Sequence, residues 1–74
     1  MTLDQIDKNK TALITKLDTS GVLLKKFYDM GFIEGSQITL IRKSPLNDPI
    51  EVKISSYHIT LRIQEAKCIK VRYE

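Results

Sequence analysis

The stretch Phe27-Tyr28-Asp29-Met30-Gly31-Phe32-Ile33-Glu34-Gly35-Ser36 decides how this chain folds. Its first residues end an amphipathic helix, which we predict to run from about Val22 to Met30. Gly31 stands where a left-handed C-terminal cap is needed, because glycine enters that conformation without a steric penalty from Cβ. Gly35 is predicted to hold a positive φ in the turn before the next strand. The stretch therefore indicates a short helix followed by a β-strand.

The predicted helix has a broad apolar face. At 100° per residue its apolar side chains fall within an arc of about 160°. They are Leu23, Leu24, Phe27, Tyr28 and Met30. Lys25 and Asp29 lie opposite, at the i,i+4 spacing of a helical ion pair. The side chains of residues 18–21 are suited to capping the start of the helix. We expect the centre of the arc to pack on the core and its margin to be exposed.

Most of the remaining chain alternates between apolar and polar residues, as half-buried strands do. Five such segments are predicted, at residues 11–17, 38–41, 50–55, 57–62 and 69–73. Short helical turns are expected at residues 3–6 and 64–67. Five strands with one apolar face each, in residues 1–74, favour a single mainly β domain that forms a closed or nearly closed barrel. Tyr57 and Tyr73 are expected to point inward with the apolar set.

Composition limits the classes of function. The 74 residues carry a formal net charge of +3, and no basic run exceeds two residues, so the charge is a mild bias. The single cysteine allows no internal disulfide, which fits a reducing compartment. The acidic N-terminus has no apolar run of the kind a signal peptide needs, and no segment is long enough to span a membrane. We therefore expect a cytoplasmic protein without direct membrane insertion.

The residue types needed for catalysis or metal binding are scarce. His58 and Cys68 are the only soft metal ligands, whereas a metal site normally has three or four ligands. We expect His58 to be a solvated surface residue and Cys68 a small packed one. No Ser-His-Asp arrangement or phosphate-binding glycine loop can be assembled. The sequence therefore predicts a protein that is not an enzyme, with no cofactor and no metal site.

Two segments are candidate binding surfaces. The first is the helix margin, where Leu24, Lys25 and Tyr28 form a partner-facing patch, joined by Phe27 if it is not fully buried. The second is the loop from Pro45 to Pro49, in which two prolines reduce the entropic cost of binding. Its Leu46 side chain must either fold inward or meet a partner. Simpler roles are a helix face that belongs to the core and a rigid loop that fixes the strand register.

Four segments of the chain together resemble the FeoA family. Each is weak alone, but they occur in the family's order and spacing, and they cover most of the chain after Thr11. They are Lys26-Phe27-Tyr28-Asp29-Met30-Gly31-Phe32-Ile33-Glu34-Gly35-Ser36-Gln37-Ile38, Ser44-Pro45-Leu46-Asn47-Asp48-Pro49-Ile50-Glu51-Val52, Tyr57-His58-Ile59-Thr60-Leu61-Arg62 and Glu65-Ala66-Lys67-Cys68-Ile69-Lys70-Val71. The resemblance implies a five-stranded SH3-like β-barrel with one short amphipathic helix after the first strand.

The resemblance also implies a function. FeoA domains are expected to act on the cytoplasmic side of FeoB, a GTPase-coupled permease for ferrous iron, and would be recruited to the inner face of the membrane by that partner. The chain departs from the family where glycine is common, at Ser56, and carries two aromatics, Phe27 and Tyr28, in the helix. The alternative is a small basic barrel that binds nucleic acid or peptides. We do not expect nucleic acid as a partner, because Tyr57 and Tyr73 are expected to point inward and stacking needs exposed rings.

Overall fold

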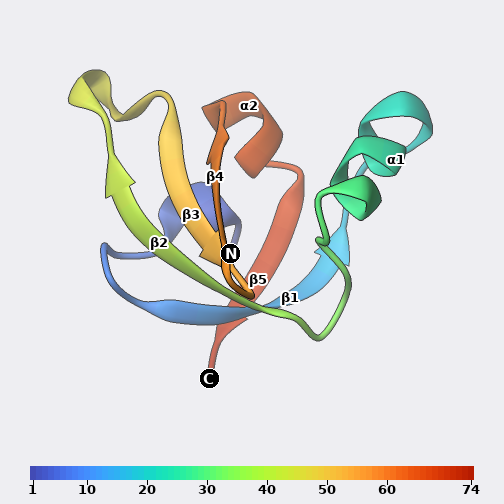
Figure 1. The fold of residues 1–74 in the computed structure, drawn as a ribbon, viewed down its shortest axis with the longest axis horizontal. Helices are drawn as coiled ribbons and strands as arrows, with labels where there is room; N and C mark the ends of the chain where they lie inside the picture. Colours follow the sequence, from blue (N-terminus) through green and yellow to red (C-terminus); the bar gives the residue numbers. More distant parts are fainter.

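Five antiparallel strands form one strongly bent sheet in the computed structural model, which describes residues 1–46 and 48–74 (Figure 1). Their order is β4-β3-β2-β1-β5. The strands are β1 (Thr11–Leu17), β2 (Gln37–Lys43), β3 (Ile50–Ile54), β4 (Tyr57–Leu61) and β5 (Ile69–Tyr73). The helical segments are η1 (Leu3–Gln5), α1 (Gly21–Asp29), η2 (Pro45–Asn47) and α2 (Ile63–Ala66). The predicted mainly β architecture with one short amphipathic helix after the first strand is confirmed.

The barrel is nearly closed, with β4 and β5 as the two edges of the sheet. The N-terminal segment covers the edge of β5: Thr2 forms a bridge to Lys70, and the Val71 N–H donates to the Met1 carbonyl at 2.9 Å. The opposite edge, on β4, has no such cover among the described residues. Instead α1 lies at its side. The two edges therefore meet different surroundings.

Local chemistry explains how α1 ends. Gly31 has φ +91°, the Gly31 N–H donates to the Tyr28 carbonyl at 3.0 Å, and the Phe32 N–H donates to the Phe27 carbonyl at 2.9 Å. These two bonds form a Schellman cap. The hydrophobic contact that usually accompanies the cap is present, because the rings of Phe27 and Phe32 lie 5.7 Å apart. The prediction for Gly31 is confirmed, and Gly35 also has the predicted positive φ, +89°.

The core lies inside the bend of the sheet and is built from the inward residues of every strand together with the helical segments. The fully buried side chains with the largest volumes are Phe27, Phe32, Leu3, Ile6, Ile14, Ile38, Leu40, Ile50, Leu61, Ile69 and Val52. Leu3 and Ile6, from the short turn near the N-terminus, belong to this buried cluster. Leu23 and Met30 are half-buried against the same cluster.

Four local expectations were not met. The helix begins and ends one residue earlier than predicted, and its N-cap residue, Ser20, makes no capping hydrogen bond through its side chain. The alternation along β4 predicts correctly which residues share the inward face, but it does not predict how deeply each is buried. Tyr57 is 64% exposed, whereas Leu61 on the same face is 1% exposed. Tyr57 follows the Ser55-Ser56 turn at the hairpin tip, beyond the end of the core. Tyr73, also expected inside, is 38% exposed, and its hydroxyl accepts the Asp7 N–H.

No helix among the described residues has the length and apolar character needed to cross a membrane.

Candidate partner-binding site

An open groove of about 510 Å³ separates the C-terminal end of α1 from the edge strand β4. Its lining residues come from these two elements and are Tyr28, Asp29, Met30, Gly31, Tyr57, His58 and Ile59. The Schellman cap positions the α1 wall, because it turns the chain back into the core at Phe32. The β3–β4 hairpin positions the other wall. Both walls are therefore held by the packed core.

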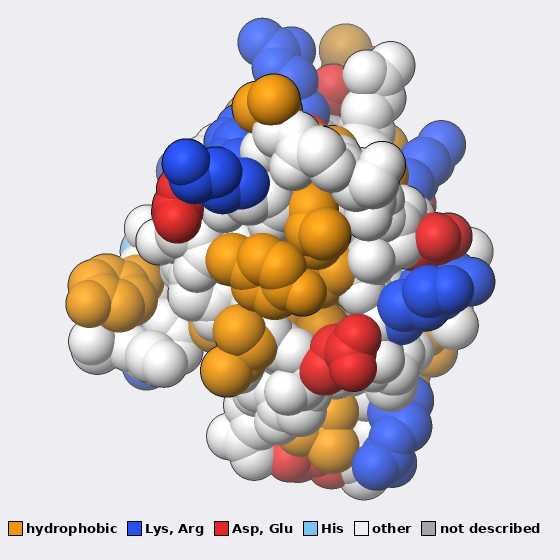
Figure 2. Space-filling model, turned by 90° about the vertical axis from the view of Figure 1, so that its right-hand side faces the viewer, with side chains coloured by type: hydrophobic (Ala, Val, Ile, Leu, Met, Phe, Trp, Pro, Cys, Tyr) orange, Lys and Arg blue, Asp and Glu red, His pale blue; other side chains and the backbone are white. Residues whose placement is uncertain are grey.

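The groove has a largely apolar lining that includes two large aromatic side chains. Tyr28 is 52% exposed and Tyr57 is 64% exposed, one on each wall. Met30 and Ile59 are half-buried between them and the core. Figure 2 looks onto the α1 side of the molecule and shows hydrophobic side chains gathered at its centre, with charged side chains around them. An apolar centre with a charged rim is the usual layout of a protein-binding surface.

The charge at the groove is set by Asp29 and His58. Asp29 has no ion-pair partner among the residues that the structure describes. The His58 Nδ1 atom lies 3.1 Å from Glu51 Oε2, and Arg42 Nε lies 3.1 Å from Glu51 Oε1. The hydrogen bond from His58, helped by Arg42, lowers the pKa of Glu51. Glu51 is thus held ionised beside the imidazole, which leaves the Asp29 carboxylate as the free charge on the groove wall.

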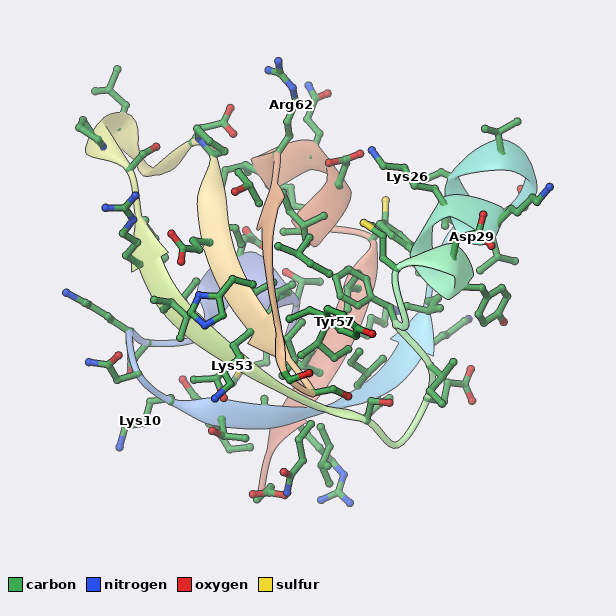
Figure 3. The ribbon with its side chains drawn as sticks, viewed as in Figure 1. Lys10, Lys26, Asp29, Lys53, Tyr57 and Arg62 are labelled. Atoms are coloured by element: carbon green, nitrogen blue, oxygen red, sulfur yellow. The ribbon has the colours of Figure 1, made fainter. Side chains whose placement is uncertain are left out.

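An ion pair joins the two helices beyond the groove. Lys26 Nζ lies 2.7 Å from Glu65 Oε2 and links α1 to α2, and Figure 3 shows Lys26 extending from α1 towards α2. The hydrogen bond from Lys26 is the main cause of the lowered pKa of Glu65. The same carboxyl group accepts the Arg62 N–H at the start of α2. The pair is therefore one link between α1 and the C-terminal half of the chain.

The structure divides the predicted helix patch. Tyr28 lines the groove and Lys25 is exposed, whereas Leu24 is half-buried against the core. Phe27 is fully buried, so the condition for including it in the surface is not met and it belongs to the core. Leu23, on the same face of the helix, is half-buried against the core. The helix thus exposes a smaller apolar surface than the width of its arc suggested.

The loop between β2 and β3 presents a separate feature. Leu46 is 96% exposed and has φ +67°, a left-handed conformation that is unfavourable for leucine. The base of the loop is held by Ser44, whose N–H and Oγ both donate to the Pro49 carbonyl, and Asp48 accepts the Ile63 N–H. Leu46 therefore does not fold inward. Figure 1 places this loop and α1 at opposite ends of the molecule, so Leu46 does not join the groove.

Sequence reasoning missed Tyr57, Met30 and Ile59 as groove residues. Alternation along β4 gives the face on which a side chain lies but not whether another element covers it. The position of Tyr57 directly after the Ser55-Ser56 turn was the available signal, because hairpin tips extend past the core. Figure 3 shows the Tyr57 side chain extending from β4 towards the α1 side.

The two soft ligands lie where they were expected. His58 is exposed, and Cys68 is half-buried against the core, with its thiol 3.6 Å from the Gln64 carbonyl. Among the residues that the structure describes, no three His, Cys, Asp or Glu side chains gather as metal ligands would. The groove walls supply aromatic rings, aliphatic groups and one free carboxylate. This chemistry suits a protein or peptide.

Comparison with known proteins gives the family. The model of the FeoA domain matches residues 1–73. The chain belongs to the FeoA domain family. Its fold agrees with that of solved FeoA proteins: the solution structure of iron(II) transport protein A from Clostridium thermocellum is 40% identical with a TM-score of 0.95, and the match covers 99% of this chain and 45% of that one. The family connects the chain with ferrous iron transport.

Two further relatives describe the type of fold and a larger protein in which an FeoA domain occurs. FeoA from Stenotrophomonas maltophilia, described as a prokaryotic SH3 domain protein, is 25% identical with a TM-score of 0.79, covering 96% of this chain and 88% of that one. The predicted SH3-like barrel is thereby confirmed. A fusion of Fe(2+) transport protein A with the Fe(2+) transporter FeoB in Porphyromonas gingivalis is 34% identical over 71 residues. Those residues are 96% of this chain but only 8% of the fusion protein.

Proposed function

We propose that this FeoA domain is a cytoplasmic accessory protein of ferrous iron uptake, which binds the membrane GTPase-permease FeoB and modulates its GTPase activity or assembly. It has no catalytic activity, cofactor or metal of its own in this proposal, and it is recruited to the inner face of the membrane by its partner. The observation that carries the proposal is the P. gingivalis fusion, in which an FeoA and an FeoB form one chain.

The fusion is informative because it raises the effective concentration of one module at the surface of the other. Linking two modules by a short chain raises their effective concentration to about the millimolar range, which makes even a weak contact effective. A relative that keeps both modules in one chain favours a direct contact between them. In this protein the same contact would have to form between separate chains, or between parts of a longer chain, through an exposed surface of the barrel.

The surface proposed for this contact is the helix margin with its groove. Tyr28 is its anchor, Lys25 and the exposed part of Leu24 flank it, and Leu46 offers a second contact at the far loop. Aromatic anchors beside charges carry much of the energy in protein interfaces. Two separate contacts on opposite ends would let one small domain hold a large partner in a defined orientation.

The test is binding of the purified chain to full-length FeoB from the same organism in detergent. Tyr28→Ala is expected to weaken binding at least tenfold, which corresponds to about 1.4 kcal/mol. Val22→Ala is the matched control, because Val22 lies on the same helix, is 87% exposed and does not line the groove. Equal losses in both variants would move the contact away from Tyr28. No saturable binding by the unaltered chain would refute the proposal.

One observation supports a second candidate function. The argument against nucleic acid required Tyr57 to point inward, and Tyr57 is instead exposed on the strand that carries His58, whose register partner is Lys53. An exposed ring is the minimum for stacking on a single strand, although Lys53 and His58 lie on the other face of the sheet from Tyr57. Affinity for a single-stranded oligonucleotide that falls steeply between 50 and 200 mM salt would support this function. We rank it second, because one exposed ring on the sheet is a small stacking surface.

A further inference from the structure

The outer edge of β4 has backbone groups that the sheet does not use. Ile54 and Tyr57 flank the two-residue turn, so they form a hydrogen-bonded pair, and such pairs alternate along an antiparallel ladder. Lys53–His58 and Glu51–Thr60 are then the non-hydrogen-bonded pairs. The N–H and C=O groups of His58 and Thr60 therefore point away from β3. Neither residue's backbone finds a partner in the part of the chain that the structure describes.

These unused groups lie at the groove. His58 and Ile59 line the hollow next to α1, and Thr60 lines the next hollow along the same edge, together with Lys26 and Arg62. Backbone donors and acceptors that alternate along an edge are complementary to one kind of ligand, another extended chain. The side chains at the groove add pockets beside that edge. The edge thus offers main-chain hydrogen bonds for affinity and apolar pockets for specificity.

The geometry around β4 allows a single extended segment to pair with its outer edge more easily than the edge of a second sheet could. The α1 helix stands beside β4 and forms the opposite wall of the groove, so an approaching sheet would meet the helix before its own edge reached β4. A single extended segment needs only the width of one strand, about 4.8 Å from β4. Edge-to-edge association of two copies is also opposed by the charged neighbours Lys53 and Arg62 and by the short length of β4.

The charge of the groove indicates what the segment carries. Asp29 on the α1 wall is the free carboxylate, while His58 is bound to Glu51. Tyr28, Met30, Tyr57 and Ile59 supply the apolar surface. A segment with an apolar side chain on one face and a lysine or arginine within reach of Asp29 matches both features. Both side chains must face the groove. Residues on the same face of a strand are two positions apart, so the apolar and the basic residue would be at positions i and i+2 of the segment.

We propose that β4 accepts an extended segment of the FeoB permease as a sixth strand of the sheet, paired through the backbones of His58 and Thr60. The apolar side chain of the segment fits between Tyr28 and Tyr57, and its basic side chain faces Asp29. This inference rests on the proposed function and specifies its binding mode. It differs from the contact proposed above because the main chain of the FeoA domain, rather than its side chains alone, does the binding.

The decisive test removes one backbone donor. His58→Pro deletes the outward N–H without affecting the ladder to β3, and proline is tolerated at an edge position of this kind. His58→Ala is the matched control, because it removes the same side chain and keeps the N–H. Binding of both full-length variants to full-length FeoB in detergent is measured beside the unaltered chain. We expect His58→Pro to bind at least tenfold more weakly than His58→Ala, because both variants lack the imidazole and only the proline variant lacks the outward N–H.

Folding is checked by circular dichroism and thermal unfolding, and a second measurement needs no variant. Exchange of the His58 and Thr60 amides with deuterium is followed in the unaltered chain, alone and in the complex. We expect both amides to become protected on binding. Binding in which His58→Pro behaves like His58→Ala, or in which these amides stay unprotected, would overturn the strand addition and leave the proposed function intact. Failure of the unaltered chain to bind would overturn both.

Discussion

At one edge of the sheet, β5 is covered by the N-terminal segment, whereas at the other edge β4 faces only the groove beside α1. The cover on β5 combines the hydrogen bond that the Val71 N–H donates to the Met1 carbonyl and the bridge between Thr2 and Lys70 with the burial of Leu3 and Ile6. The residues around β4 are exposed tyrosines and charges. A small barrel can thus close one edge for stability and keep the other available for a partner. The predictions below test each side of this comparison.

The largest effect is expected at the covered edge. Leu3→Ala removes a fully buried side chain that holds the N-terminal segment on β5, and it should lower the free energy of unfolding by about 3 kcal/mol. Urea denaturation monitored by circular dichroism measures the change. Val22→Ala, at an exposed site, should stay within about 0.5 kcal/mol of the unaltered chain. A loss below 1 kcal/mol for Leu3→Ala would show that the cover contributes little.

A smaller loss is expected at the wall of the open edge. Gly31→Ala places a Cβ on a residue with φ +91°, with no neighbouring atom within 4 Å, so the cost comes from the backbone alone. We expect about 1–2 kcal/mol, measured in the same assay. Binding to FeoB should weaken as well, since Gly31 orients the α1 wall. Unchanged stability would mean that the α1 terminus does not require this conformation.

A substitution in the hairpin that carries β4 should increase the stability of the protein. Ser55 has φ +53°, and Ser56 is not among the residues with positive φ, a pattern that fits a type II′ turn with its preference for glycine at the first central position. Ser55→Gly should raise the free energy of unfolding by about 0.5 kcal/mol, because relief of strain exceeds the added entropy of the unfolded chain. A thermal melt measures it. A fall in the melting temperature would contradict this account of the turn.

The smallest effect concerns the ion pair that connects α1 to α2. The Lys26 hydrogen bond lowers the pKa of Glu65 from its ordinary value of 4.5, so the pair stabilises the fold above that pH and loses its effect as the pH falls through the lowered value. Lys26→Met should cost about 0.5 kcal/mol at pH 7, and this cost should shrink as the pH falls through the lowered pKa of Glu65. Unfolding of both chains across this range, with an NMR titration of Glu65, measures the difference. A loss independent of pH would point to lost packing.

The sequence predicted the elements better than their exposure. The bounds of β1 follow from the alternation of apolar and polar residues, and the positive φ angles of Gly31 and Gly35 follow from the steric freedom of glycine. Both are local properties of the chain. Tyr57 was placed inside because it shares a face with Leu61, and only the extent of the core shows that the face is bare at that end. The width of the helix arc does not decide whether Phe27 lies at the surface or in the core, because it does not show where the sheet meets the helix. Exposure depends on contacts distant in sequence.

The most direct test of the comparison is deuterium exchange of individual amides in the chain alone, followed by NMR. The account predicts slow exchange at Val71, whose N–H is bonded to Met1 on the covered edge. It predicts fast exchange at His58 and Thr60 on the open edge, with slow exchange at Ile59 between them. Protection of His58 and Thr60 equal to that of Ile59 would contradict the account, because β4 would then not be an open edge.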